Sequence, residues 1–325
     1  MNIRRKVSLP LAAMLLCSAA AASAKTPVLL STDVGNEIDD QWAIVYLLTS
    51  PEFDVQGIVS AHAPSLPAPS AHATYKILVD EVENRMGMMV HPALLEGSSL
   101  PLENNKAPQP SAALDFILQT SQGYSKENRL DVLTIGAATD VASAILKDPT
   151  IVDRINVVAM GFKDLSSEGG KEYNVQNDPK AWQVILNSGV PVTIGSGDVC
   201  RANLSLSFQQ AAALLSGHGP VAAWLWDEYQ TWYYVHIKPL RVNDFSKAWI
   251  IWDIITLAHV EGITTEKEIA RPVLGDDLSL KEATKKETGK INWIETVDSA
   301  RLWKEFIERL DAYDRTHAIK PLEMP

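Results

Sequence analysis

The sequence predicts an α/β protein with an open, mostly parallel central sheet flanked by helices. Two observations and one general rule lead to this prediction. Short apolar runs rich in Val, Ile and Leu alternate with longer amphipathic segments, and most of these runs lack polar alternation. Strand–helix–strand repeats join parallel strands through right-handed crossovers, which place helices against the faces of the sheet.

The expected elements follow one another from Lys25 onward. The predicted strands are Pro27–Thr32, Asp54–Ala61, Ala93–Glu96, Leu130–Gly136, Ile155–Gly161 and Pro191–Gly195. The predicted helices between them are Asp39–Leu48, Ala71–Asn84, Ser111–Ser121, Thr139–Leu146 and Pro179–Asn187. Residues 207–260 form a mainly helical pattern, and mixed elements return near Ile269–Leu274 and Ile291–Val297.

Residues 1–24 have the anatomy of a secretory signal peptide. A basic start is followed by the short apolar run Leu9–Ala22, and Ala22-Ser23-Ala24 supplies a cleavage site of small residues. The run is too short for an ordinary membrane span. We therefore predict an exported protein, periplasmic or secreted, that is not attached to a membrane after cleavage. Residues 25–325 contain no linker and no repeat, so they are expected to form a single domain.

Composition and charge limit the classes of function. The chain has 325 residues, 46% of them hydrophobic and 21% charged, which is typical of a globular protein and not of a disordered one. Its formal net charge is -11. Proteins that bind nucleic-acid phosphates normally have the opposite charge balance. A nucleic acid is therefore not an expected partner.

An acidic loop follows the first predicted strand. The stretch from Ser31 to Asp40 contains Asp33, Glu37, Asp39 and Asp40, four carboxylates within eight residues. In open α/β folds, ligands bind at the carboxyl ends of the strands. Several carboxylates beside an apolar strand are costly unless a cation compensates them, and an oxygen-only set suits calcium or magnesium. The alternative is that the Asp pair only caps a helix, where the helix dipole favours acidic residues.

This loop resembles the N-terminal signature of the calcium-dependent nucleoside hydrolases, the inosine-uridine preferring group and its relatives. Further motifs follow in the family's order between residues 27 and 259. They are the stretch Leu133–Ala142, Val158-Ala-Met160-Gly161, Glu172-Tyr-Asn174, Asp178-Pro-x-Ala181, Ser188-Gly-x-Pro191, Asp198-Val199 and Trp252-Asp253. Each motif is weak alone, but the ordered set is fairly specific and identifies a divergent member with the family's nucleoside hydrolase-like, Rossmann-like fold.

The resemblance implies roles for individual residues. Calcium would be held by Asp33, Asp40, Asp253 and the backbone carbonyl near Ile135. Asp39 would be the general base that takes a proton from a calcium-bound water, and Met160, Glu172 and Asn174 would contact the ribose. The implied reaction is hydrolysis of the N-glycosidic bond of a ribonucleoside or a related N-riboside. Family members are often dimers or tetramers, so a homodimer or homotetramer is expected.

The sequence also departs from the family pattern. Ser31 and Val34 replace an Asp and a Pro of the signature, and two extra residues precede the Asp pair. Glu37 is therefore an alternative candidate for a metal ligand, and the sequence leaves open whether it binds the ion. Trp252 stands where several members have a His that protonates the leaving base. His62, at the end of the second strand, is a further candidate for substrate binding.

Two other functions remain open from these residues. One is a catalytically altered, exported solute-binding protein that keeps the ribose pocket. The other is an Asp-dependent hydrolase acting on another substrate, although Ser31 occupies the place of the nucleophilic Asp in one such class of phosphatases.

Aromatic residues crowd one predicted helical stretch, and most of them are expected to pack in the core or at a subunit interface. One or two, together with Trp252, are expected to line the base pocket. His236 and His259 lie near this region and are candidates for an acid, although a structural role is the commoner one for a histidine.

Overall fold

The computed structural model describes residues 24–237, 247–282 and 289–317. The predicted signal peptide lies outside these residues except for Ala24. Within the described ranges, no helix combines the length and the apolar character that crossing a membrane requires.

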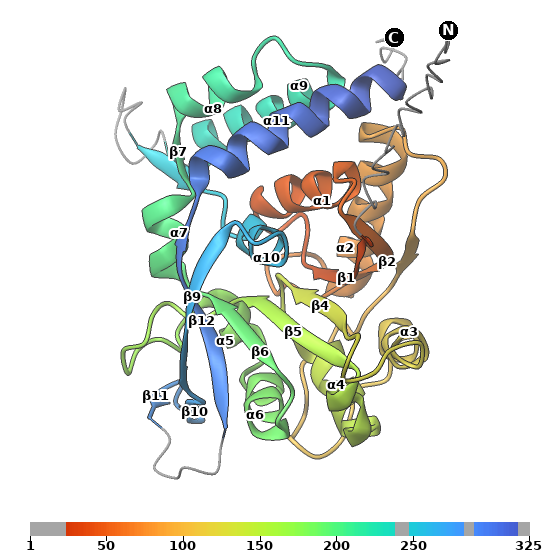
Figure 1. Ribbon diagram of the computed structural model, residues 1–325, viewed down its shortest axis with the longest axis vertical. Coiled ribbons are helices and arrows are strands. Elements are labelled where there is room, and N and C mark those ends of the chain that lie inside the picture. Colours follow the sequence, from red (N-terminus) through yellow and green to blue (C-terminus); the bar gives the residue numbers. More distant parts are fainter. Residues whose placement is uncertain (1–23, 238–246, 283–288, 318–325) are drawn as a thin grey trace, which may run out of the picture.

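A central sheet of eight strands organises the molecule, in the order β3-β2-β1-β4-β5-β6-β12-β9 (Figure 1). Every neighbouring pair is parallel except β12 and β9, which are antiparallel. The strands are β1 (Thr26–Thr32), β2 (Phe53–Ser60), β3 (Ala93–Leu95), β4 (Leu130–Thr134), β5 (Ile155–Met160), β6 (Val192–Gly195), β9 (Thr264–Ala270) and β12 (Lys290–Val297). The predicted fold class is therefore confirmed, and the six predicted parallel strands are all present.

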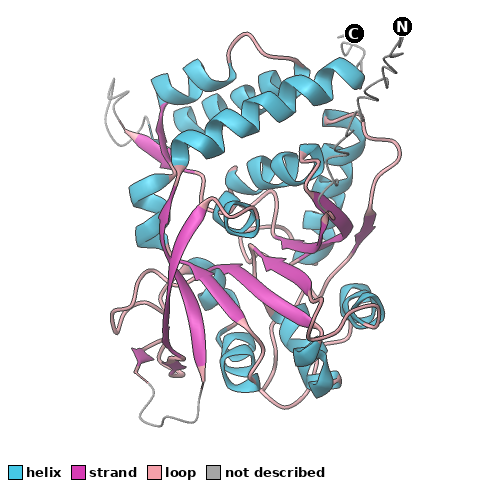
Figure 2. Ribbon diagram, viewed as in Figure 1, coloured by secondary structure: helices cyan, strands magenta, loops and turns pink. Residues whose placement is uncertain are grey.

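Helices cover both faces of this sheet (Figure 2). The α-helices are α1 (Asp39–Thr49), α2 (Ser70–Asp80), α3 (Ala112–Ser121), α4 (Thr139–Lys147), α5 (Tyr173–Asn177), α6 (Pro179–Ser188), α7 (Gly197–Asn203), α8 (Phe208–Leu215), α9 (Pro220–Trp232), α10 (Ile254–Val260) and α11 (Ser299–Thr316). Two π-helical turns, Glu81–Arg85 and Tyr233–Ile237, and the 3-10 helix Pro149–Asp153 complete them. The helix predicted over Ala71–Asn84 therefore ends earlier, because its last turn widens into the first π-helical turn.

Small paired strands lie beside the main sheet. β7 (Ser205–Ser207) pairs with β8 (Ala248–Ile250), and β10 (Val273–Leu274) pairs with β11 (Leu280–Lys281). The first pair joins the two ends of the mainly helical region.

The strands are apolar throughout because both faces of the sheet are buried. In β1, Val28 and Leu30 belong to the core that contains α1, α10 and α11, whereas Leu29 belongs to the core with α3, α4 and α6. In Figure 1 these two sets of helices lie on opposite sides of the sheet. Alternate residues of a strand point to opposite faces, so a strand covered on both sides lacks polar alternation.

Local signals in the sequence fix the helix ends. The Asp178 carboxylate accepts a hydrogen bond from the backbone N–H of Ala181 at 2.9 Å, and Pro179 follows as the first residue of α6. At the other end Gly189 takes a left-handed conformation with φ 84°. An acidic cap, an initial Pro and a terminal Gly are the sequence marks of a helix with defined ends.

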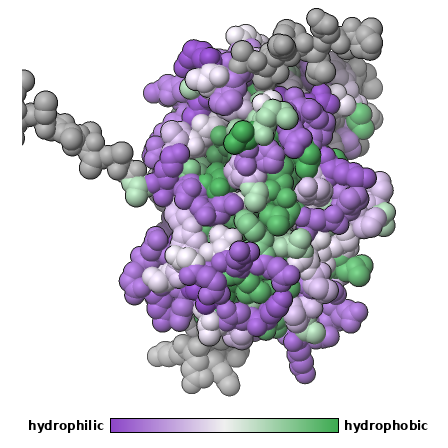
Figure 3. All heavy atoms as spheres, turned by 90° about the vertical axis from the view of Figure 1, so that its right-hand side faces the viewer, coloured by the Kyte–Doolittle hydropathy of each residue, from purple (hydrophilic) through white to green (hydrophobic). Residues whose placement is uncertain are grey.

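The molecular surface is mixed in character. Figure 3 shows one face on which hydrophobic residues gather toward the middle and hydrophilic residues surround them. Exposed large apolar residues of the described chain include Met89, Val90 and Leu100. Exposed apolar atoms are normal in folded proteins.

Candidate active site

A cavity lies at the carboxyl end of the parallel strands, where open α/β folds bind their ligands. It has a volume of about 720 Å³. Residues that follow β1, β4, β5 and β6 line it, together with residues from α5, α7 and the segment before α10. Three groups of side chains form this cavity: an acidic floor, an aromatic wall and a charged rim.

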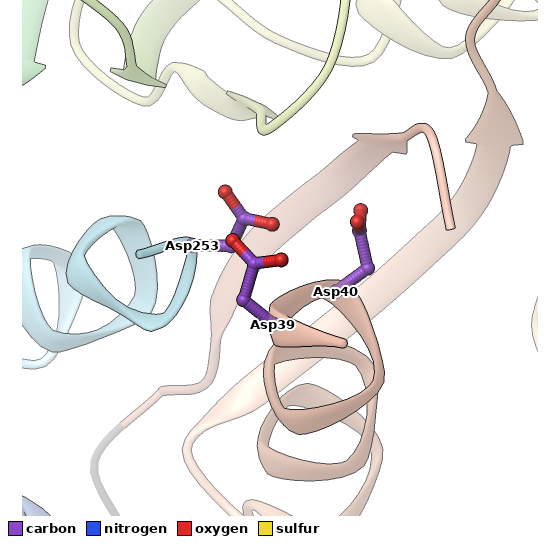
Figure 4. A group of neighbouring side chains, drawn as sticks. All are labelled: Asp39, Asp40 and Asp253. Carbon is purple, nitrogen blue, oxygen red and sulfur yellow. The ribbon is translucent and has the colours of Figure 1, made fainter. Parts of the chain in front are cut away.

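The acidic floor consists of Asp33, Asp39, Asp40 and Asp253. Carboxylate oxygens of Asp39, Asp40 and Asp253 lie within 4.8 Å of one another (Figure 4). Asp33 follows β1 and lines the same cavity. Each of the four residues is at most 5% exposed. The structure thus brings together carboxylates from two segments about 210 residues apart, as the family resemblance implied.

Local backbone structure places these carboxylates. Gly35, with φ 97°, allows the tight turn in which the N–H of Asn36 donates to the carbonyl of Asp33 at 3.2 Å. The chain then enters α1, whose first residues are Asp39 and Asp40, where the helix dipole favours negative charge. Gly136 packs so closely that a Cβ atom there would lie 3.0 Å from the backbone nitrogen of Asp33.

The electrostatics of the floor call for a cation. Burial raises the pKa of Asp33, Asp39 and Asp253 well above the ordinary value, and the neighbouring carboxylates raise each pKa further. Burial also raises the pKa of Asp40 to about 7, although Thr32 donates a hydrogen bond to it at 2.5 Å. Asp33 Oδ2 is buried without a hydrogen-bond partner. Such a group of carboxylates is costly to keep charged unless a positive ion binds among them.

The donor set matches a hard divalent cation. Its side-chain donors are all carboxylate oxygens, which are the ligands that calcium and magnesium prefer. The residues of the floor can therefore hold a metal ion. Calcium itself remains a prediction.

The residues expected to contact ribose lie beside this floor. Glu172 caps α5 by accepting hydrogen bonds from the N–H groups of Asn174 and Val175, both at 3.0 Å. Burial raises the pKa of Glu172 to about 7. The Asn174 amide donates to the carbonyl of Ile135 at 3.1 Å, and Met160 lines the cavity next to it. The Ile135 carbonyl, predicted as a metal ligand, thus also accepts a hydrogen bond from a predicted ribose contact.

Three indoles form the aromatic wall: Trp232, Trp249 and Trp252. Trp232 and Trp249 meet edge to face with ring centroids 5.5 Å apart. One aromatic residue of the crowded helical stretch therefore lines the cavity, as predicted, while Trp224 and Tyr229 lie in the core. Sequence reasoning missed Trp249, although it stands three residues before the recognised Trp252-Asp253 pair.

Glu37 lies where the floor meets this wall. Its pKa rises to about 7 because burial outweighs the opposing effect of the Trp249 and Trp252 side chains. Glu37 Oε2 and the indole nitrogens of Trp232 and Trp249 are buried without hydrogen-bond partners. The indoles of Trp249 and Trp252 therefore lie beside the Glu37 carboxylate, but neither Glu37 Oε2 nor Trp232 Nε1 is satisfied by a described residue.

Basic and polar side chains form the rim, and sequence reasoning did not identify them. The guanidinium carbon of Arg201 lies 5.4 Å from the ring centroid of Trp252. Lys163 and Lys171 also line the cavity, and Lys171 pairs with Glu168. Tyr173 donates a hydrogen bond to Asn36 at 3.1 Å and so links α5 to the acidic loop.

The predicted histidines have different surroundings. His62 is not among the residues that line the cavity; it is buried, and its Nε2 lies 3.1 Å from Thr139 Oγ1, which donates to Asp178 at 2.6 Å. Burial lowers the pKa of His62 although Asp178 opposes this effect. The predicted substrate contact of His62 thus gains no support from its position. His236 does line the cavity, whereas His259 lines a different one and lies 3.3 Å from Glu266.

The fold and the site together define an α/β protein with an oxygen-rich site for a cation in its principal cavity. The chain belongs to the family described as inosine-uridine preferring nucleoside hydrolase, whose model matches residues 28–304. This match confirms the resemblance inferred from the ordered motifs.

Two curated relatives match part of the chain. Pyrimidine-specific ribonucleoside hydrolase RihA of Escherichia coli O1:K1 is 28% identical in an alignment of 202 residues that covers 53% of this chain and 60% of that protein. A Schizosaccharomyces pombe protein named uncharacterized protein C1683.06c is 33% identical over 138 residues, 40% of this chain and 44% of that protein. The chain thus spans less than two thirds of the length of either relative.

Solved structures share the fold over nearly the whole chain. A plant nucleoside hydrolase, PpNRh1, matches with a TM-score of 0.71 and 17% identity, covering 89% of this chain and 100% of that one. A purine-preferring ribonucleoside hydrolase from Gardnerella vaginalis matches with a TM-score of 0.67 and 21% identity, covering 90% and 100%. At these identities the likeness establishes the fold alone.

Proposed function

We propose that this protein hydrolyses the N-glycosidic bond of ribonucleosides or related N-ribosides. The single observation that carries this proposal is the convergence of Asp39, Asp40 and Asp253 at the floor of the main cavity, in a chain of the nucleoside hydrolase family. The bond breaks through a sugar that resembles an oxocarbenium ion, and an anionic pocket stabilises the positive charge that develops on it.

Asp39 is proposed as the general base. It opens α1 at the floor, where burial and the charges of Glu37 and Asp40 raise its pKa and so increase its affinity for a proton. A carboxylate in this position takes the proton of the attacking water as its oxygen bonds to the anomeric carbon. Glu172 and Asn174 are proposed to hold the ribose hydroxyls, since both are buried and line the same cavity.

Calcium is proposed as the cofactor, held by Asp33, Asp40 and Asp253. When bound, it supplies a Lewis acid that orients oxygen ligands and lowers the pKa of water. The raised carboxylate pKa values and the partnerless Asp33 Oδ2 support this assignment, because both mark negative charge that lacks a positive counterpart.

A substrate panel tests the proposed function. The purified chain is incubated with purine and pyrimidine ribonucleosides and with pyridinium ribosides, in calcium or after chelation, and released base and ribose are measured. The expected result is release of both products in calcium, loss of release after chelation, and recovery when calcium is restored. Binding of ribosides without release of either product would refute hydrolysis and support the solute-binding alternative.

Export is a second proposal, supported by the leader-like residues 1–24. It predicts a mature chain that begins at Lys25. N-terminal sequencing of the protein recovered from the periplasm or the medium tests this, and an intact N-terminus on cytoplasmic protein would contradict it.

A further inference from the structure

The wall of the cavity carries a carboxylate without a cationic partner. Glu37 faces Trp249 and Trp252, and its Oε2 has no hydrogen-bond partner. It precedes Asp39 by two residues on the loop before α1, and among the described residues no ion pair joins it to a basic side chain. A half-buried carboxylate in aromatic surroundings is costly unless a positive or hydrogen-donating ligand compensates it.

The surrounding indoles favour positive charge as well. The face of an indole attracts a cation, and Arg201 already lies over the Trp252 ring at 5.4 Å. Among the described residues that line the cavity, eight are acidic, whereas the basic ones are Lys163, Lys171 and Arg201. Acidic residues therefore outnumber these basic ones by five, which exceeds the two charges of a divalent ion.

We propose that this pocket selects N-ribosides whose leaving group is a positively charged aromatic heterocycle, such as a pyridinium or an N-alkylated purinium. The Glu37 carboxylate compensates the positive charge of the heterocycle, and the indoles of Trp232 and Trp249 pack against the heterocyclic ring. This proposal rests on the proposed N-riboside hydrolysis and names its substrate class.

The chemistry of such a leaving group agrees with the residues present. The ring nitrogen keeps the electron pair of the broken bond to the anomeric carbon, so the base departs neutral and needs no proton. The water oxygen bonds to that carbon and its proton passes to Asp39. Trp252 cannot donate a proton to the base as a histidine does. Its presence is therefore compatible with hydrolysis of such a riboside. His236, the histidine that lines the cavity, is exposed and stacks on Trp232 with ring centroids 3.7 Å apart.

The test compares one cationic and two neutral substrates. The kcat/KM for nicotinamide riboside, a pyridinium, is divided by that for inosine and for uridine, in wild type and in Glu37→Gln. Loss of one favourable charge contact is expected to lower this ratio about tenfold, which corresponds to about 1.4 kcal/mol. Asp164→Asn, which neutralises another carboxylate of the cavity, is the matched control and should shift the ratio by less than about twofold.

Glu37→Asp keeps the charge and should retain the preference, which separates charge recognition from a folding defect. A ratio unchanged in Glu37→Gln, or lowered equally in Asp164→Asn, would overturn the proposal.

A binding experiment separates this proposal from the proposed function. Calorimetry measures the affinity of the calcium-loaded wild type for 1-methylnicotinamide, a cation, and for nicotinamide, its neutral analogue. Tighter binding of the cation, lost in Glu37→Gln, supports the proposal even if no riboside is cleaved, in which case only the proposed function fails. Equal binding of the two, or preference for nicotinamide, overturns the cationic preference whatever the outcome of the substrate panel.

Discussion

The floor and the wall of the cavity differ in how their side chains are satisfied. The floor gathers four buried carboxylates whose pKa values are raised by burial and by one another. The wall consists of indoles, two of which meet edge to face, and Glu37 lies where the wall joins the floor. The floor is thus suited to a small, highly charged ion, and the wall to a flat ring. Variants that change one of them and not the other test this division of roles.

The largest effect is expected from Asp39→Asn. The amide cannot accept the proton of water, so turnover should fall by about 10²–10⁴-fold, the usual contribution of a general base. The substitution also removes repulsion among buried carboxylates, so the metal-free protein should keep its fold. Steady-state kinetics and circular dichroism check the two expectations. Turnover near that of the wild type would exclude Asp39 as the base.

Calcium is expected to stabilise the floor in a pH-dependent manner. The pKa of Asp40 is about 7 in the folded chain and 3.8 ordinarily, so the metal-free folded state binds more protons than the unfolded state between these values. The free energy of unfolding of the metal-free protein should therefore fall as pH rises from about 4 to about 7. Below pH 4 the contribution of the protonated Asp40 to that free energy is fully present.

Thermal denaturation with calcium and with a chelator checks this expectation. At pH 8 the carboxylates are ionised and can bind calcium. Calcium at 100 times its Kd should therefore add about 2.7 kcal/mol to the free energy of unfolding. At pH 5 the gain should be smaller because protons compete for the same oxygens. A calcium effect that is equal at both pH values, or larger at pH 5, would contradict a site made of these carboxylates.

Trp252→His alters the wall alone. An imidazole at this position can protonate a neutral leaving base, so kcat for inosine should rise about tenfold, toward the lower range of general acid catalysis. The pyridinium riboside leaves without a proton and should gain nothing. Trp252→Phe is the control for the loss of the indole. If inosine turnover in the histidine variant does not exceed that of the phenylalanine variant, a histidine at this position does not protonate the leaving base.

The smallest effect on catalysis is expected from His62→Gln. His62 packs against Thr139 away from the cavity lining, so KM should change by less than about twofold while the loss of a buried hydrogen bond costs about 1 kcal/mol of stability. Kinetics and chemical denaturation measure both quantities. A large rise in KM with unchanged stability would instead support His62 as a substrate contact.

The parallel strands and the acidic loop after β1 were predictable because their signals are local. Apolar runs such as Ile155–Met160 are buried on both faces, and Asp39 and Asp40 follow a strand in a recognisable motif. Asp253 was placed through the resemblance, since no local rule relates it to a loop about 210 residues earlier.

The remainder depends on long-range packing. β12 joins the sheet beside β6, and this pairing has no local signature in the residues 291–297 that were predicted only as a mixed element. The helix Ser299–Thr316 was not predicted, although Leu302, Phe306 and Leu310 recur at helical spacing and are buried. The wall also depends on long-range packing. Trp249 lies in β8, which pairs with β7, and it lines the cavity.

The central claim is that Asp33, Asp40 and Asp253, brought together from distant parts of the chain, hold one cation beside Asp39. A calcium titration by calorimetry, with wild type and Asp253→Asn, tests it most directly. The account predicts one calcium per wild-type chain, and binding weakened at least about tenfold when one carboxylate ligand is removed. Wild-type affinity in the Asp253→Asn protein would contradict it.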